Sequence, residues 1–204
     1  MSIKLNGSRL TLFRGERCLF RDLEFALNSG ELLLLEGRNG SGKTSLLRAI
    51  AGLIELESGT VFWNDEPVRN MRQLFQNSMV WMSHKVGFKG DLTLVENLQF
   101  EAKLRLESTR DFDDVLQRLG LKKLKRLPFR SLSAGQQRRV ALARMLLSAA
   151  PLWMMDEPAS NLDAQGRELV ATLLSEHVGK GGMAIVAAHQ DVKLDLPTHR
   201  IALQ

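Results

Sequence analysis

A glycine-rich segment after an apolar run is the part of this sequence that most directly suggests chemistry. Residues 37–44 read GRNGSGKT and follow four consecutive leucines. In this pattern the glycines let backbone N–H groups curl around phosphate oxygens, and the helix that follows favours an anion at its N-terminus. We therefore predict a phosphate-binding loop, called the phosphate loop below. Its candidate nucleotide contacts, with the next residue included, are Gly37, Arg38, Asn39, Gly40, Ser41, Gly42, Lys43, Thr44 and Ser45.

Two acidic residues at the end of a second apolar run complete a candidate centre for ATP hydrolysis. Asp156 and Glu157 follow the run LWMM. Ligands of open α/β sheets bind at the carboxyl ends of strands, where both acids are expected. We predict that Asp156 and Thr44 hold Mg²⁺, which prefers oxygen ligands, and that Lys43 reaches the β- and γ-phosphates. Glu157 would polarise the attacking water. Taken alone, the Asp-Glu pair would equally suit a salt bridge at a strand end.

The elements that must position these residues alternate between strand and helix patterns. The leucine run at residues 32–35 is typical of a strand buried on both faces. Strands are expected at residues 3–5, 9–13, 22–27, 31–36, 61–64, 79–82, 153–155 and 184–188. Helices are expected at residues 43–51, from 133 onward and near 164–177. This alternation indicates an α/β core with a largely parallel sheet.

The middle of the chain has a different pattern. Between about residues 90 and 130, apolar residues recur at helical spacing among Leu, Lys, Arg and Glu. We interpret this stretch as a small helical lobe. The chain is then one domain over residues 1–204, with a β-rich part and a core at about 1–88 and 136–204, and the lobe at about 89–135.

Composition favours an ordinary globular protein. The 204 residues are 44% hydrophobic and 25% charged, and the formal net charge is +5. The only basic cluster, at residues 122–126, lacks interleaved aromatic residues, so we assign it to a solvated face and expect no direct nucleic-acid partner. The single cysteine, Cys18, suits a reducing compartment. No run has the ~18–20 apolar residues of a membrane span, and the N-terminus lacks the apolar core of a signal peptide.

A third motif narrows the range of protein families that fit the sequence. Residues 132–136 read LSAGQ, here called the signature segment, and Ser133 is by itself a good helix N-cap. The ordered set of phosphate loop, LSAGQ and Asp156-Glu157 resembles the ATP-binding-cassette (ABC) family, whose signature is LSGGQ. The resemblance covers essentially the whole chain. It implies an α/β P-loop NTPase core with an N-terminal antiparallel β-subdomain and an inserted helical lobe that carries the signature.

The resemblance also implies roles for single residues. Phe13 occupies the place of an aromatic residue that stacks on adenine, although core packing is an alternative for one Phe in a strand. Ser133, Gly135 and Gln136 would contact the ATP held by a second copy of the chain, which makes the active unit a head-to-tail homodimer. Asp163 lies in a segment that links the two ATP sites, and His189 would contact the γ-phosphate.

One position departs from the family pattern. The family has a Gln about forty residues after the phosphate-loop Lys, where it touches Mg²⁺ and relays motion to the partner. His84 stands at that place here. Imidazole is a poorer Mg²⁺ ligand than an amide oxygen, but it can hydrogen-bond a metal-bound water. We therefore keep His84 as a candidate catalytic and coupling residue, and leave open whether it touches Mg²⁺.

Finer details resemble one branch of the family, the ATPase of the bacterial cytochrome c maturation (haem exporter) system. They include Glu36, the segment from His84 to Leu98 and the run LSAGQQRRVALAR, whereas Lys85 departs from the Gln usual there. The resemblance implies an integral membrane permease, haem-handling membrane and chaperone partners, and a place on the cytoplasmic face of the inner membrane. No covalent haem is expected, because the sequence has no C-x-x-C-H motif.

Three alternatives compete with this interpretation. An ABC transporter for another substrate fits the same motifs, because the ATPase subunit rarely determines specificity. An ABC ATPase that acts on nucleic acid or ribosomes would need a long insertion or a second cassette. A nucleotide-binding module without turnover is opposed by the presence of Lys43, Asp156, Glu157 and His189.

Overall fold

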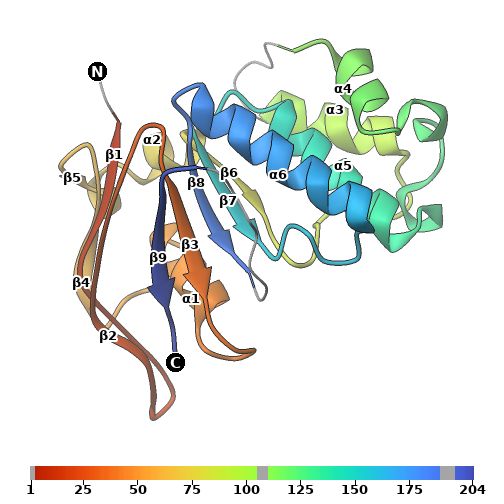
Figure 1. The fold of residues 1–204 in the computed structure, drawn as a ribbon. Helices are drawn as coiled ribbons and strands as arrows, with labels where there is room; N and C mark the ends of the chain where they lie inside the picture. Colours follow the sequence, from red (N-terminus) through yellow and green to blue (C-terminus); the bar gives the residue numbers. More distant parts are fainter. Residues whose placement is uncertain (1–2, 105–109, 189–195) are drawn as a thin grey trace.

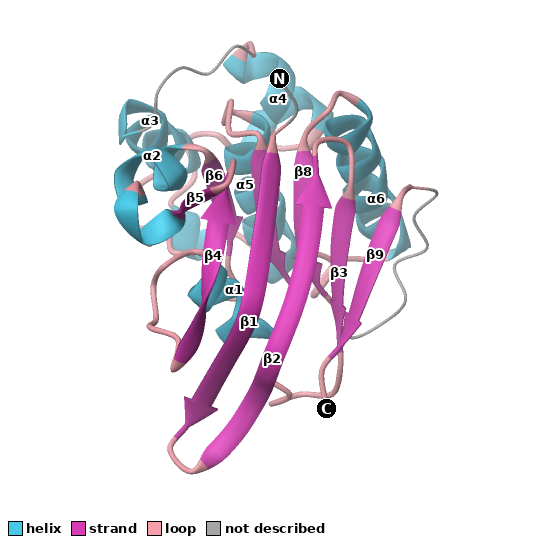
Figure 2. Ribbon diagram, turned by 90° about the vertical axis from the view of Figure 1, so that its left-hand side faces the viewer, coloured by secondary structure: helices cyan, strands magenta, loops and turns pink. Residues whose placement is uncertain are grey.

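The computed structural model describes residues 3–104, 110–188 and 196–204, and it contains two sheets. The first sheet is antiparallel with the order β2-β1-β4-β5. Its strands are β1 (Lys4–Arg14), β2 (Arg17–Asn28), β4 (Ser58–Trp63) and β5 (Glu66–Pro67). Figure 2 shows the long β1–β2 hairpin in front of the second sheet. The predicted antiparallel β-subdomain is therefore confirmed.

The prediction of two short strands at residues 3–5 and 9–13 was wrong, because β1 runs through both. The register of β1 against β2 shifts between Gly7 and Leu10, and Arg9 has a left-handed φ of 48°. An irregularity of this kind re-aims the strand without ending its pairing. The irregular backbone at Arg9 requires a glycine at position 59 of β4, because a Cβ there would lie 2.3 Å from the Arg9 carbonyl oxygen.

The second sheet is parallel and has the order β6-β7-β8-β3-β9. Its strands are β3 (Leu32–Glu36), β6 (Met79–Met82), β7 (Leu152–Asp156), β8 (Met183–Ala187) and β9 (Thr198–Ala202). Four of them were predicted, and β9 was not. Because the strands of this sheet run parallel, the phosphate loop after β3 and the acids at the end of β7 share one edge of the sheet.

Helices cover both faces of the parallel sheet. They are α1 (Lys43–Ile50), α2 (Arg72–Asn77), α3 (Leu94–Leu104), α4 (Phe112–Arg118), α5 (Ala134–Leu146) and α6 (Ala164–Gly179), with short 3-10 turns at Val68–Asn70, Lys122–Leu124 and Phe129–Ser131. In Figure 1, α5 and α6 lie on the side opposite the antiparallel sheet, with α3 and α4 beyond them. The stretch predicted as a helical lobe contains α3, α4 and the turns that lead to α5.

The leucine run of β3 explains how one strand serves two cores. Leu32 and Leu34 pack in a core with α5, α6 and the lobe. Leu33 and Leu35 pack in a core that α1 shares with the antiparallel sheet. Because side chains alternate across a strand, burial on both faces requires an unbroken apolar run. This two-sided burial makes β3 a rigid support for the loop that follows it.

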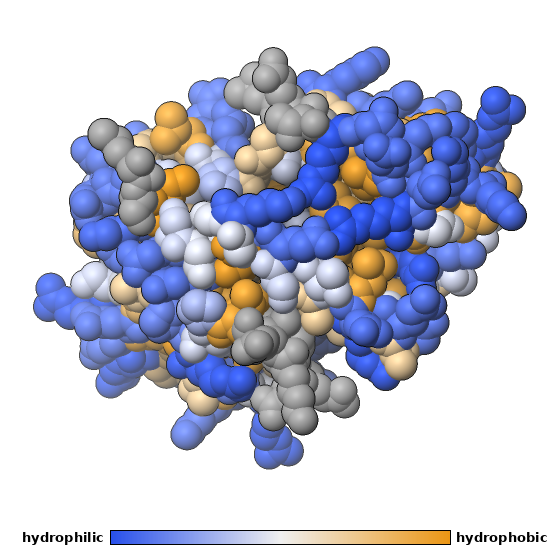
Figure 3. Space-filling view, turned by 45° about the horizontal axis from the view of Figure 1, so that its top comes forward, coloured by the Kyte–Doolittle hydropathy of each residue, from blue (hydrophilic) through white to orange (hydrophobic). Residues whose placement is uncertain are grey.

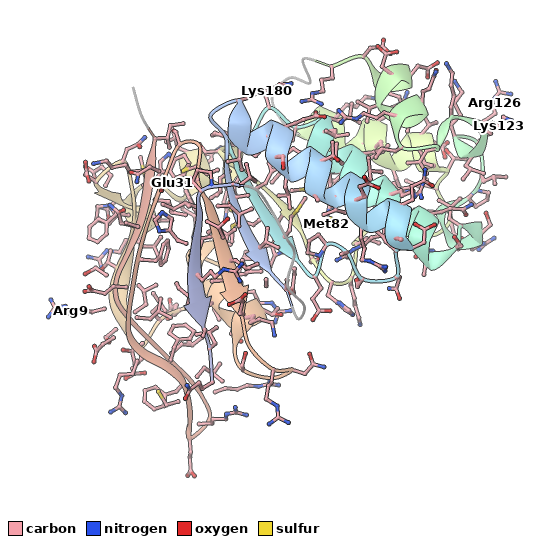
Figure 4. The ribbon with its side chains drawn as sticks, viewed as in Figure 1. Arg9, Glu31, Met82, Lys123, Arg126 and Lys180 are labelled. Atoms are coloured by element: carbon pink, nitrogen blue, oxygen red, sulfur yellow. The ribbon has the colours of Figure 1, made fainter. Side chains whose placement is uncertain are left out.

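One face of the molecule is mainly polar. The face in Figure 3 is largely hydrophilic, with apolar side chains in separate groups. Figure 4 shows Lys123 and Arg126 pointing outward at the far edge of the lobe. The neighbouring Lys122 and Lys125 ammonium groups lie 3.9 and 3.4 Å from the Asp113 carboxylate. Within the described ranges, no helix is both long and apolar enough to span a membrane.

A partly buried imidazole makes the stability of the fold depend on pH. The His177 ring stacks on Trp153 at 4.0 Å, and its Nε2 lies 3.1 Å from the Pro151 carbonyl oxygen. Burial lowers the pKa of His177 to about 4, against the opposing effect of two carbonyl groups. His177 therefore becomes protonated below about pH 6.5 in the unfolded chain but only near pH 4 in the folded chain.

We expect the free energy of unfolding to fall by up to about 3 kcal/mol from this group as the pH drops from 6.5 to 4. Urea titrations at pH 7, 6 and 5 should show that the free energy of unfolding falls more steeply with decreasing pH for the wild type than for His177→Gln. The other titrating groups are the same in the two proteins. Equal pH slopes for the two proteins would contradict this prediction.

Candidate functional site

The phosphate loop is built around a lysine that folds back inside it. Gly37 and Gly42 have φ values of 146° and 105°, a region that side chains disfavour. A Cβ on Gly37 would also lie 2.4 Å from the Leu203 carbonyl oxygen. Lys43 is only 5% exposed, and its Nζ donates to the carbonyl oxygens of Gly37 (2.6 Å) and Arg38 (3.1 Å). The cation thus lies within the curl of the loop, as phosphate binding requires.

The two predicted Mg²⁺ ligands are in direct contact. The Thr44 hydroxyl, in the first turn of α1, donates to Asp156 Oδ2 at 2.8 Å. Asp156 ends β7 and is 3% exposed, although 112 positions separate it from Thr44. A hydroxyl and a carboxylate side by side are hard oxygen donors of the kind that Mg²⁺ prefers. The residues present therefore fit this ion.

Glu157 is held in an unusual backbone conformation beside His84. Its φ is 51°, a region that costs a non-glycine residue about 1–3 kcal/mol. Its N–H donates to the Ala187 carbonyl of β8 at 2.8 Å. His84 Nδ1 lies 3.8 Å from Glu157 Oε2, and the two side chains are 63% and 29% exposed. An exposed contact at this distance is weak, so His84 lies within reach of the carboxylate without fixing it.

A pocket of about 240 Å³ opens next to these groups. It combines phosphate-loop residues with Glu157 and with three side chains that were not predicted: Arg14, Leu19 and Arg48. Arg14 and Leu19 belong to the β1–β2 hairpin, which also carries Phe13. Phe13 is 36% exposed, and the Arg21 guanidinium lies 5.9 Å from the centre of its ring. The packing of the antiparallel sheet on α1 brings this hairpin to the phosphate loop, so no local pattern could have indicated it.

The signature segment begins α5 and lies apart from this pocket. The exposed Ser133 is the N-cap and accepts from the Gln136 N–H, while Gln136 Oε1 accepts from the Ser133 N–H at 2.9 Å. Gly135 approaches a neighbouring loop closely, since a Cβ there would lie 3.1 Å from the Asn161 carbonyl oxygen. Among the described residues that line the pocket, none comes from the signature segment.

Asp163 and His189 are the remaining predicted contacts. Asp163 is the N-cap of α6, and its Oδ1 accepts from the Gly166 N–H at 2.7 Å. The Arg139 guanidinium lies 3.8 Å from the same carboxylate. His189 falls outside the residues that the structure describes.

Sequence reasoning also missed a buried guanidinium. Arg138, one turn into α5, is 3% exposed and donates to backbone carbonyl groups around β6 and β7. Burial lowers its pKa to about 10, although the Asp156 and Glu157 carboxylates act in the opposite direction. It remains a cation at neutral pH. The QQRR run does not distinguish it from an exposed helix arginine.

The weak contact of His84 leads to a test. We expect His84→Gln to keep kcat for ATP hydrolysis within about threefold of the wild type, because an amide, like the imidazole, can hydrogen-bond the metal-bound water expected at this position. His84→Ala should lower kcat about five- to tenfold, the value of one modest hydrogen bond. Steady-state ATPase assays of the three proteins would check this. Identical kcat values for all three would remove His84 from the site.

Comparisons with known proteins identify the family of this chain. The pattern of the ABC transporter family matches residues 20–160. The cytochrome c biogenesis ATP-binding export protein CcmA of Pasteurella multocida is 43% identical over 95% of this chain and 92% of its own length. The protein of the same name from Vibrio cholerae is 41% identical over 96% of each chain.

Solved structures support the fold. An ATP-binding protein of a putative ABC transporter from Pyrococcus furiosus superposes with a TM-score of 0.85 at 21% identity, covering 98% of this chain and 97% of its own. A nucleotide-free ATP-binding cassette from an ABC transporter superposes with a TM-score of 0.82 at 22% identity, covering all of this chain and 88% of its own. At these identities the likeness concerns the fold alone.

Proposed function

This chain belongs to the ABC transporter family, and we propose that it hydrolyses ATP to drive a membrane partner in cytochrome c biogenesis. The observation that carries the proposal is the contact between Thr44 and Asp156 beside Glu157. Through this contact the phosphate loop, two hard oxygen donors and a candidate base lie together at one edge of the parallel sheet. ATP binding follows from the family, and the assignment of each residue is part of the proposal.

We assign some of these residues to nucleotide binding and one to proton transfer. Backbone N–H groups of the phosphate loop and the Lys43 ammonium hold the β- and γ-phosphates. Thr44 and Asp156 would hold Mg²⁺, which when bound neutralises charge on the phosphate oxygens. Glu157 orients a water toward the γ-phosphate and accepts its proton. Phe13 gives the adenine a ring to stack on, and His189 is assigned to the γ-phosphate.

The separation of the signature segment from the pocket supports a head-to-tail dimer. Ser133 is exposed and caps a helix whose N-terminus favours an anion. Gly135 has no side chain to keep a phosphate away. In the dimer these residues, together with Gln136, cover the ATP held by the partner, and Asp163 lies along the path between the two sites. Hydrolysis then removes the group that holds the two copies together.

The partners are proposed from the relatives. Their name specifies cytochrome c biogenesis and export, and they match this chain over nearly its full length. We assign the chain to the cytoplasmic face of a bacterial inner membrane, where an integral permease holds it and haem-handling membrane and chaperone proteins accompany it. Haem delivery is the substrate assignment that the sequence resemblance favours. Nucleic acid is not among the proposed partners.

Purification from membranes in mild detergent tests this assignment. A small polytopic protein with haem-handling companions should co-purify, and a Lys123→Glu variant on the outer edge of the lobe should bring down the same proteins. A different permease would keep the ATPase and replace its substrate. Ribosomes or RNA in place of any membrane protein would contradict the transport role.

A further inference from the structure

The guanidinium of Arg138 connects two segments that carry catalytic candidates. On the β7 side, its Nη2 donates to the Asp156 carbonyl at 2.7 Å and to the Glu157 carbonyl, and its Nε donates to the Pro158 carbonyl at 3.2 Å. On the β6 side, its Nη1 donates to the carbonyls of Ser83 (3.0 Å) and His84 (3.4 Å). One planar group thus fixes the backbone at both ends of the contact between His84 and Glu157.

The conformation of Glu157 depends on this group. A residue with a φ of 51° persists only where its surroundings hold it there. The Glu157 N–H is held by β8 and its carbonyl by Arg138. Charge-assisted hydrogen bonds are stronger than neutral ones, and burial of the guanidinium leaves it no water as an alternative partner. Arg138 therefore sets the direction in which the Glu157 carboxylate leaves the backbone.

The same arginine is rigidly connected to the signature segment. Ser133 caps α5, and Arg138 follows five residues later on the same helix. An α-helix moves as a unit, so a shift of its first turn displaces Arg138 with it. In the proposed dimer that first turn contacts the ATP held by the partner subunit.

We propose that Arg138 is a positioning residue that transmits the state of the partner's ATP to Glu157 and His84 of its own subunit. The proposal rests on the proposed head-to-tail dimer. When α5 docks on the partner's ATP, Arg138 draws the carbonyls of residues 83–84 and 156–158 into line, and the carboxylate faces its water. When α5 withdraws, the carboxylate loses that alignment, so turnover requires the closed pair.

Arg144 provides a matched comparison, because it lies on the same helix and is also buried. Its guanidinium donates to the carbonyls of Trp81 (2.7 Å) and Val86 (3.3 Å) and contacts the Phe88 ring. These contacts lie on the β6 side, whereas Arg138 also donates to the carbonyls of residues 156–158. A merely structural role for Arg138 predicts that substitutions at the two positions have the same consequences.

The test compares Arg138→Lys with Arg144→Lys in the full chain. A lysine ammonium is a compact donor and cannot reach acceptors on both segments at once. We expect Arg138→Lys to lower kcat about 10- to 100-fold, as misplacement of a catalytic group does, with KM and nucleotide affinity within twofold. Arg144→Lys should lose similar thermal stability and keep kcat within about threefold. Arg138→Gln, which buries no unpaired cation, serves if the lysine variant does not fold.

Two outcomes overturn the proposal. One is an unchanged kcat in a folded Arg138 variant, and the other is an equal loss of kcat in the Arg138 and Arg144 variants. Size-exclusion chromatography of Glu157→Gln with ATP distinguishes a failure of the Arg138 proposal from a failure of the proposed dimer. If that protein dimerises while Arg138→Lys keeps its turnover, only the role of Arg138 fails. If it remains a monomer, the dimer itself fails.

Discussion

Replacing Glu157 by Gln should stop ATP hydrolysis, leave ATP binding intact and trap a dimer. The amide has nearly the shape of the carboxylate but cannot accept a proton from water. Loss of a general base costs about 10²- to 10⁴-fold in rate. The phosphate loop and the Thr44–Asp156 contact remain, so the affinity for ATP should change little. Because the γ-phosphate that joins the two copies is never removed, the closed pair should accumulate.

Size-exclusion chromatography with light scattering, run with and without Mg-ATP, would detect the trapped pair. The matched control is Glu168→Gln, an exposed acid on α6 that should keep wild-type turnover and stay monomeric after its ATP is spent. A Glu157→Gln protein that is monomeric with ATP would contradict the head-to-tail dimer. One that still hydrolyses ATP would remove Glu157 as the base.

Local patterns predicted the parts of the molecule that the chemistry needs most. The strand at residues 79–82 was predicted with its observed bounds, and α1 begins at Lys43 as expected. The strand signal is strong because all four of its residues are apolar. The start of the helix is marked by the glycine-rich motif directly before it. The contact of Thr44 with Asp156 could be anticipated as well, since parallel strands end at the same edge.

Features that depend on distant partners could not be predicted in this way. Strand β9 has no fully buried residue and a weak apolar pattern, and it forms because β3 offers an edge to pair with. Arg14 and Arg48 line the pocket only because the first hairpin lies over α1. Arg138 stands among other helix arginines, and what distinguishes it is a set of carbonyl groups 18–20 and 54–55 positions away. The sequence therefore identifies the candidate nucleotide site, but it does not identify the residues that line or support this site from distant parts of the chain.

Replacing Lys43 by Ala should abolish nucleotide binding at working concentrations while the fold persists. A charge-assisted bond to a phosphate contributes about 1.5–3 kcal/mol, and two such bonds, to the β- and γ-phosphates, would lower the affinity by at least about 100-fold. The carbonyls of Gly37 and Arg38, which now accept from Lys43, lie on a partly exposed loop and can bind water instead. Thermal stability should therefore change far less than affinity.

Calorimetric titration with ADP and with a non-hydrolysable ATP analogue would measure this loss, with Lys123→Ala as a charge-matched control on the outer edge of the lobe. The control distinguishes a local role from the general effect of net charge, which both variants change by one. If Lys43→Ala bound the analogue as tightly as Lys123→Ala does, residues 37–44 would be an ordinary glycine-rich turn. A 100-fold loss for the analogue and a smaller loss for ADP would place the ammonium nearer the γ-phosphate, because only the analogue carries that group.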